Sequence, residues 1–160
     1  MEARLDNGDR TPGFDLLAAG SGRRVRLRGL VGRKAVLVFH LQGTARGINR
    51  AVRERFPDPE EVFVASVIDP SIIPSLYWMT VGLVLGSAYE QARRELPPDV
   101  DPADYLVILP DWNGRVSRDY GVRNTGRADA IVVVDEDSNS ILSYRKERPV
   151  EAVLEALEDG

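Results

Sequence analysis

The chain has 160 residues, of which 43% are hydrophobic and 29% are charged, so it is long enough for one soluble domain over residues 1–160. Its 21 basic and 25 acidic side chains give a net charge of -4, which argues against nucleic acid as a partner because binding to phosphates begins with positive charge. Cysteine is absent and His40 is the only histidine, which excludes disulfides, iron–sulfur clusters, zinc held by thiolates and a cysteine nucleophile. We therefore expect no metal and no cofactor. The N-terminal residues carry no secretory signal, and we expect a cytoplasmic protein.

The first half of the chain predicts a strand–helix–strand unit. Residues 24–30 (RVRLRGL) alternate as a half-buried strand does. Residues 35–41 (AVLVFHL) and 62–68 (VFVASVI) are continuous apolar runs, which are typical of strands covered on both faces of a sheet. Between these runs, apolar residues recur at helical spacing at Ile48, Ala51, Val52 and Phe56. Two strands joined by a helix are expected to pair in parallel.

The second half predicts three helices and three further strands. The expected helices lie at about 75–96, 116–120 and 149–157, and the expected strands at 105–109, 130–134 and 141–144. The last two strands enclose a polar turn and form a β-hairpin. Trp112 stands in a turn and is expected to pack on the sheet edge. The predicted fold class is α/β, with a mixed sheet, a βαβ unit, a C-terminal β-hairpin and helices on both faces.

Four stretches in series carry a further pattern over nearly the whole chain. They are G-x-x-x-P-x-F-x-L from Gly8, G-x-x-V-x-L-x-x-L-x-G from Gly22 into AVLVF, D-W-N-G-R-V-S-R-D-Y-G-V from Asp111, and A-I-V-V-V-D from Ala130. In these stretches the chain resembles the thioredoxin-fold redoxins, the group of peroxiredoxins (the AhpC/TSA family) and thioredoxin-like proteins. The resemblance implies a three-layer thioredoxin-like sandwich.

Redoxins carry their reactive cysteine in the loop after the AVLVF strand, and in this chain that loop has no sulfur. Aligned from Phe39 on the thioredoxin motif F-W-A-x-W-C-x-x-C, residues 44–47 (TARG) stand in place of C-x-x-C, and on the peroxiredoxin pattern the cysteine falls near Ile48. The family's cis-proline or arginine before the AIVVVD strand corresponds to Asp129. A hydroxyl has no thiolate-like form at neutral pH and cannot cycle through sulfenic acid. We therefore expect neither peroxidase nor disulfide-exchange activity.

The emptied pocket has two interpretations. In one, it binds a small anionic ligand or supports a non-redox acid–base step, through His40, Thr44, Arg46 and Asp129. In the other, the residues are structural: Thr44 caps the helix, Arg46 is solvated and His40 belongs to the core.

Residues 70–89 contain no charged side chain, so the helix predicted there would be apolar all round until Glu90. A helix on one face of a sheet leaves part of its surface uncovered, which favours an interface. Gly82 and Gly86 form a G-x-x-x-G that would let a second helix approach closely. The expected interface residues are Leu76, Tyr77, Val81, Gly82, Val84, Leu85 and Gly86. The alternatives are a helix buried in its own domain, another protein partner, or peripheral membrane association; the apolar run is too short to favour a membrane span.

The sequence thus predicts a redox-inactive, thioredoxin-like protein that serves as a binding or scaffold domain. We expect a homodimer through the helix at about residues 74–96, with no nucleic acid and no membrane as partner. The alternative is a non-redox protein or enzyme that binds a small anion in the emptied pocket near Thr44.

Overall fold

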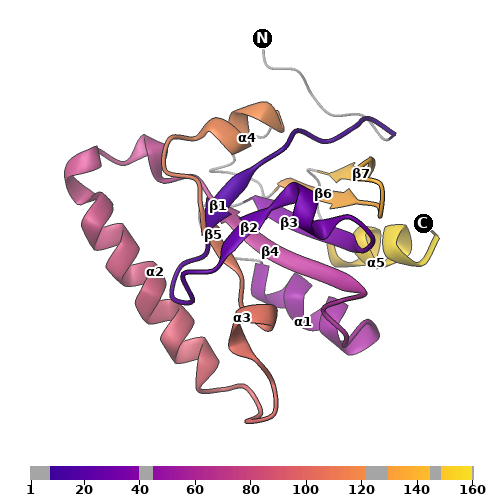
Figure 1. Cartoon of the computed structure of the whole chain (residues 1–160), viewed down its shortest axis with the longest axis horizontal. Coiled ribbons are helices and arrows are strands. Elements are labelled where there is room, and N and C mark those ends of the chain that lie inside the picture. Colours follow the sequence, from indigo (N-terminus) through magenta and orange to yellow (C-terminus); the bar gives the residue numbers. More distant parts are fainter. Residues whose placement is uncertain (1–7, 40–44, 122–129, 145–148, 160) are drawn as a thin grey trace.

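A five-stranded mixed sheet forms the centre of the protein in the computed structural model, which describes residues 8–39, 45–121, 130–144 and 149–159 (Figure 1). The strands lie in the order β5-β4-β3-β6-β7. Their bounds are Ile108–Pro110 for β5, Val62–Ile68 for β4, Lys34–Phe39 for β3, Ala130–Val134 for β6 and Ser140–Tyr144 for β7. β4 is parallel to β3 and β5, whereas β6 is antiparallel to β3 and β7. The predicted mixed sheet is confirmed.

The predicted βαβ unit is formed by β3, helix α1 (Ala45–Arg55) and β4. The two strands pair in parallel, from Lys34 opposite Val62 to Phe39 opposite Val67. From Ala35 onward, every side chain of β3 is at most 1% exposed, as expected of a strand covered on both faces.

The predicted hairpin is formed by β6 and β7. The Asp135 carboxylate organises its turn, because Oδ1 accepts hydrogen bonds from the backbone N–H groups of Asp137 and Asn139, both at 2.9 Å. Ser138 adopts a positive φ of 65° in this turn, the conformation that such a tight connection requires.

Helices α1 and α5 (Pro149–Asp159) cover one face of the sheet. Their inner residues, such as Ile48, Val52, Val153 and Leu157, pack with Val36 and Val38 of β3 and with facing residues of β4 and β6. The predicted C-terminal helix is therefore confirmed, and its apolar stripe lies in the core.

The other face is covered by a small hairpin and a short helix. Strands β1 (Asp15–Leu17) and β2 (Arg24–Arg26) pair antiparallel, and helix α4 (Arg115–Asp119) lies beside them. They bury Phe14, Val25, Val116 and other residues against Leu37 and Phe39 of β3. The short helix matches the helix predicted at about 116–120, whereas β1 was not predicted.

The strand predicted over residues 24–30 is wrong in its second half. The extended segment ends at Arg26, and residues Leu27–Leu30 form a 3-10 helix, η1. Leu27 and Leu30, three residues apart, are 7% and 5% exposed. One turn of 3-10 helix places both on the same side, and this burial outweighs the alternating pattern.

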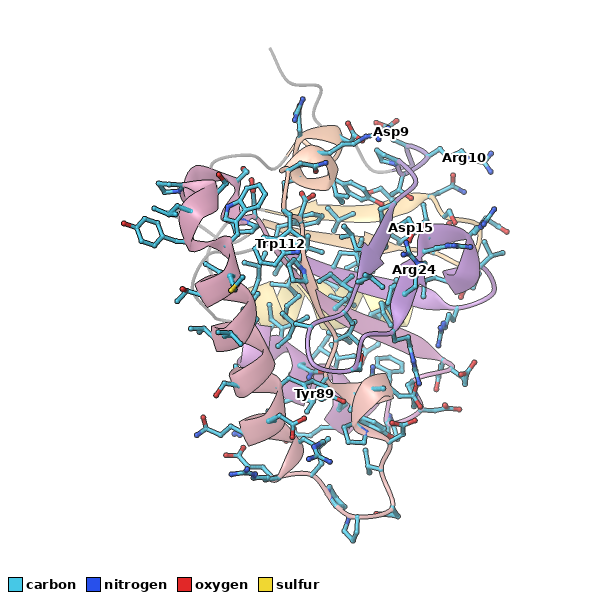
Figure 2. All side chains as sticks on the ribbon, turned by 60° about the vertical axis from the view of Figure 1, so that its left-hand side comes forward. Asp9, Arg10, Asp15, Arg24, Tyr89 and Trp112 are labelled. Atoms are coloured by element: carbon cyan, nitrogen blue, oxygen red, sulfur yellow. The ribbon has the colours of Figure 1, made fainter. Side chains whose placement is uncertain are left out.

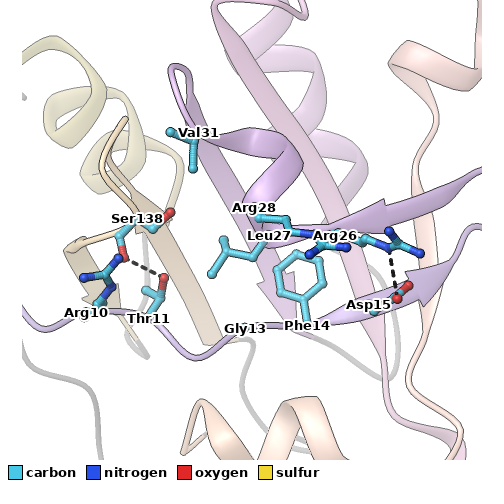
Figure 3. Close-up of a pocket in the computed structure, with 10 residues that line it drawn as sticks. All are labelled: Arg10, Thr11, Gly13, Phe14, Asp15, Arg26, Leu27, Arg28, Val31 and Ser138. Atoms are coloured by element: carbon cyan, nitrogen blue, oxygen red, sulfur yellow. Dashed lines mark hydrogen bonds and ion pairs between the residues drawn. The ribbon is translucent and has the colours of Figure 1, made fainter.

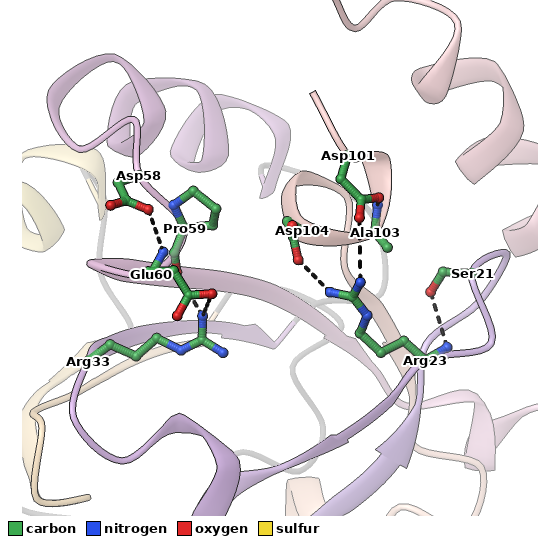
Figure 4. A network of polar contacts seen from close by, with 9 residues as sticks. All are labelled: Ser21, Arg23, Arg33, Asp58, Pro59, Glu60, Asp101, Ala103 and Asp104. Carbon is green, nitrogen blue, oxygen red and sulfur yellow. Dashed lines mark hydrogen bonds and ion pairs between the residues drawn. The ribbon is translucent and has the colours of Figure 1, made fainter. Parts of the chain in front are cut away.

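The strand predicted over residues 105–109 begins later than expected. Residues Pro102–Tyr105 form the short helix α3, in which the Asp101 carboxylate accepts a hydrogen bond from Ala103 N at 3.0 Å. Arg23 ties this helix to the β1–β2 hairpin through ion pairs with Asp104 and Asp101 (Figure 4).

The longest helix, α2, spans Trp78–Arg93 and follows two 3-10 turns, η2 (Pro70–Ile72) and η3 (Ser75–Tyr77). It is shorter than the predicted 75–96 at both ends. In Figure 1 it runs along the side of the molecule beyond β5 instead of lying across the sheet. Among the described residues, neither main core includes a side chain of α2.

Tyr120 packs in the core between the sheet and the β1–β2 hairpin, beneath the N-terminal segment. It is 1% exposed, its ring centroid lies 5.4 Å from that of Phe39, and its hydroxyl donates to the Pro12 carbonyl at 2.7 Å. Burial raises the pKa of the Tyr120 phenol well above its usual range, because the phenolate would lose its hydration.

Tyr120 should therefore make the protein less stable as the pH rises above about 10, where the phenol ionises in the unfolded chain but not in the folded one. We expect Tyr120→Phe to lower the free energy of unfolding at pH 8 by about 1 kcal/mol, because a hydrogen bond is lost. We also expect the variant to lose less of its stability as the pH rises above about 10. Urea unfolding at several pH values measures both effects. Tyr105→Phe is the control, because it also removes a hydroxyl that donates to a carbonyl, that of Pro57 at 2.9 Å, but does so at the surface. An equally steep loss of stability at alkaline pH in Tyr120→Phe and in the unaltered protein would contradict the prediction.

Candidate functional site

The carboxyl ends of the parallel strands β3, β4 and β5 share one edge of the sheet, the place where open α/β sheets bind ligands. Helix α1 begins at Ala45, after the connection that leaves β3. The predicted binding residues His40, Thr44 and Asp129 lie outside the described residues, and so does the side chain of Arg46. The emptied-pocket interpretation therefore stays a prediction.

The polar side chains described along this edge hold the backbone in place. Asp111, 1% exposed, accepts hydrogen bonds from the N–H groups of Ser117 at 2.8 Å and Val116 at 3.3 Å, and so anchors the start of α4. The Asp69 carboxylate accepts from Ser71 N at 2.9 Å. Gly114, at a φ of +70°, lies so close that a Cβ there would stand 2.8 Å from Ser71 Oγ. These carboxylates bind the turns that follow β4 and β5.

Two other kinds of site do not occur within the described ranges. No three His, Cys, Asp or Glu side chains lie together there in a group that could hold a metal ion. None of the helices described is both long and apolar enough to cross a membrane.

An exposed apolar face runs along α2 and the turn before it. Figure 2 shows side chains of α2 that point away from the rest of the protein. The large apolar residues exposed here are Leu76 at 82%, Tyr77 at 54%, Met79 at 81%, Leu83 at 71% and Val84 at 61%. We call these five residues the outer face of α2. Large apolar side chains gathered in this way are unusual on a monomeric soluble protein and mark interaction surfaces.

The structure divides the predicted interface residues into two groups. Leu76, Tyr77 and Val84 belong to the outer face, whereas Val81, Gly82, Leu85 and Gly86 are half-buried. Met79 and Leu83, the two most exposed large hydrophobic residues of α2, are not among the predicted interface residues. The spacing of 76, 79 and 83 was the signal that could have found them, because residues three and four apart share a helix face.

Trp112 attaches the first half of α2 to the rest of the protein. Its ring centroid lies 5.6 Å from that of Trp78, and a Cβ at Gly82 would stand 3.8 Å from Trp112 Cη2. Trp78 Nε1 donates to the Ile73 carbonyl at 2.9 Å, which fixes that ring. Trp112 thus packs against α2, a contact that differs from the predicted sheet-edge packing.

Tyr89 attaches the second half of α2. It is 5% exposed, and a Cβ on Gly20, in the turn of the β1–β2 hairpin, would overlap its ring. Gly20 also has a φ of +80°, so the position favours glycine for two reasons. Between Gly82 and Tyr89, α2 turns its outer side chains away from the protein.

No family model matches this chain, and no curated protein matches it either. Several solved structures are similar to it. A thiol peroxidase from Chromobacterium violaceum is similar with a TM-score of 0.68 and 16% identity, over 100% of this chain and 90% of that one. AhpC from Mycobacterium tuberculosis is similar with a TM-score of 0.63 and 18% identity, over 98% of this chain and 93% of that one. The exposed lipoprotein thioredoxin of Streptococcus pneumoniae is similar with a TM-score of 0.62 and 16% identity, over 93% of this chain and 100% of that one.

These similarities show the fold. The chain has the thioredoxin-like fold of the redoxins, as the sequence patterns implied, and it has no cysteine. Because the chain has no cysteine, it has no thiol with which to carry out thiol chemistry.

The contact between Trp112 and α2 can be tested through fluorescence, because Trp78 and Trp112 are the two tryptophans of the chain. We expect Trp112→Ala to expose the Trp78 ring, to shift its emission to the red and to lower the free energy of unfolding by about 1–3 kcal/mol. Trp112→Phe is the matched control, since it also leaves Trp78 as the single emitter but keeps an aromatic ring against it. Identical Trp78 emission in the two variants would show that Trp112 does not hold α2.

Proposed function

We propose that this chain is a redox-inactive thioredoxin-like protein that works by binding, and that it forms a homodimer through the outer face of α2. The observation that carries the proposal is the exposure of Leu76, Met79 and Leu83, which are 71–82% accessible on a helix that its own domain holds from the other side. Burying such side chains stabilises a complex by about 25 cal/mol for each Å² of apolar surface removed from water.

The charge of α2 favours a second copy as the partner. The helix carries no charged residue before Glu90, and Glu90 is itself paired with Arg93 at 2.6 Å. A partner with a charged surface would have to leave its own charges without partners against this face. The same face on a second copy has the required chemistry.

A two-fold arrangement also suits the distribution of charge along the helix. When two α2 helices pack antiparallel, their uncharged stretches meet and the charged turns at Glu90 to Arg93 remain at the two ends, in solvent. Two-fold self-association is the commonest form of oligomer, because one surface serves both partners.

Light scattering over a range of protein concentrations tests the dimer. We expect a mass of twice the 17.7 kDa of one chain, and we expect Leu83→Glu to give monomers, since it would bury two carboxylates in the interface. Gln91→Glu is the matched control, because it adds the same charge to the same helix beyond the outer face. Leu83 is 71% exposed, so circular dichroism should show an intact fold in the variant.

A monomer at every concentration, or a dimer that Leu83→Glu leaves intact, would overturn the proposed interface. A monomer that sediments with lipid vesicles, and no longer does so after Leu83→Glu, would assign the face to a membrane instead.

The place of the missing cysteines can be tested by restoring them. We expect Thr44→Cys with Gly47→Cys to form a disulfide under mild oxidant, since these positions stand where redoxins have C-x-x-C. Gly47 is exposed in α1, and a Cβ there meets nothing within 4 Å, so the second cysteine fits without strain. The single variant Gly47→Cys is the control. Mass spectrometry after alkylation counts free thiols, and two free thiols in a folded double variant would show that the alignment is wrong.

A further inference from the structure

A cavity of about 420 Å³ lies between the N-terminal segment, the β1–β2 hairpin, η1 and the turn of the β6–β7 hairpin (Figure 3). We call it the arginine cavity, because three of its lining residues are Arg10, Arg26 and Arg28. Its volume falls in the range of pockets that hold small organic molecules.

The positive charge of the arginine cavity exceeds its negative charge. Asp15, the one carboxylate among the lining residues that the structure describes, is engaged by Arg26 Nε at 3.0 Å and by Arg24 Nη1 at 2.8 Å. Within the described part of the chain, Arg10 and Arg28 have no ion-pair partner. Two guanidinium groups thus remain for a ligand, in a chain whose net charge is -4.

The wall between these two arginines is apolar. Figure 3 shows Leu27 between Arg10 on one side and Arg28 on the other, with Phe14 beside it and Val31 above. Phe14 and Leu27 are buried, at 9% and 7% exposed, whereas Val31 is 60% exposed and offers its side chain to an incoming group. An anion that pairs with the arginines therefore needs an apolar body to cover this wall.

Backbone contacts hold the cavity open in advance of a ligand. Thr11 donates to the Ser138 carbonyl through its N–H at 2.9 Å and through Oγ1 at 2.8 Å, which fixes the side that carries Arg10. Leu27 N donates to the Phe14 carbonyl at 3.2 Å, which fixes the side that carries Arg28. A preformed site loses less entropy on binding than one that must be ordered.

We propose that the arginine cavity binds a small organic anion with an aliphatic or aromatic body, its acidic groups paired with Arg10 and Arg28 and its body packed on Leu27 and Val31. Guanidinium groups suit carboxylates because they donate two parallel hydrogen bonds to the two oxygens. The site is independent of the proposed dimer, and the two can fail separately.

Calorimetric titration with three probes of the same chain length tests the proposal: suberate with two carboxylates, octanoate with one, and octanol with none. We expect affinity to fall in that order, and we expect Arg10→Ala with Arg28→Ala to weaken octanoate binding about tenfold or more. Both arginines are exposed and lack ion-pair partners among the described residues, so the fold should remain intact, as a melting curve will show.

The matched control is Arg50→Ala with Arg118→Ala. Both residues are exposed and lie outside the cavity lining, and their loss changes the net charge by the same amount. Equal weakening in the two double variants, equal affinity for octanol and octanoate, or the absence of binding would overturn the proposal. Loss of binding in Arg46→Ala alone would place the anion at the emptied pocket instead.

Discussion

Burial of the central strand β3 on both faces is the constraint on which the other elements depend. Its alternate residues belong to different cores: Leu37 and Phe39 face the small hairpin, and Val36 and Val38 face α1 and α5. A shift of one residue would exchange the two sets and place the Phe39 ring among the close-packed valines of the other face. The register against β4 and β6 is fixed for this reason. The end of β3, and with it the edge at which α1 begins, follows from that register.

The elements predicted correctly are those whose burial is visible in a few consecutive residues of the sequence. The run Val62–Ile68 became a strand with those bounds, because a continuous apolar segment of that length has one stable place in such a sheet. Local hydrogen bonds explain the failures. The helical turn that begins at Asp101 and Pro102 includes Tyr105, the first residue of the strand predicted over 105–109, and β1 is three residues long and depends on pairing with β2.

The candidate surfaces were harder to predict, because contacts between distant residues create them. An apolar stretch does not indicate which side of a helix its own domain covers. In α2 the answer comes from Trp112 and Gly20, which lie after and well before the helix in the sequence. The arginine cavity joins Arg10 and Arg28 only because Thr11 is bound to the distant Ser138. The sequence does show four arginines from Arg23 to Arg28, but it does not show that Asp15 forms ion pairs with two of them.

The β1–β2 hairpin connects the two proposed binding surfaces, and its own ion pairs explain how they can work separately. Gly20 in its turn holds Tyr89 of α2, while Asp15 and Arg26 on its strands line the arginine cavity. Hydrogen bonds from Arg24, reinforced by Arg26, lower the pKa of Asp15 below its usual value, so this carboxylate remains charged and keeps both arginines engaged. An anion entering the cavity therefore meets Arg10 and Arg28, which have no ion-pair partner in the described structure, before it could compete for Arg26. Because the ligand need not break the pairs that hold β1 and β2, the hairpin keeps its contact with α2, and the outer face of α2 is the same with the cavity filled or empty.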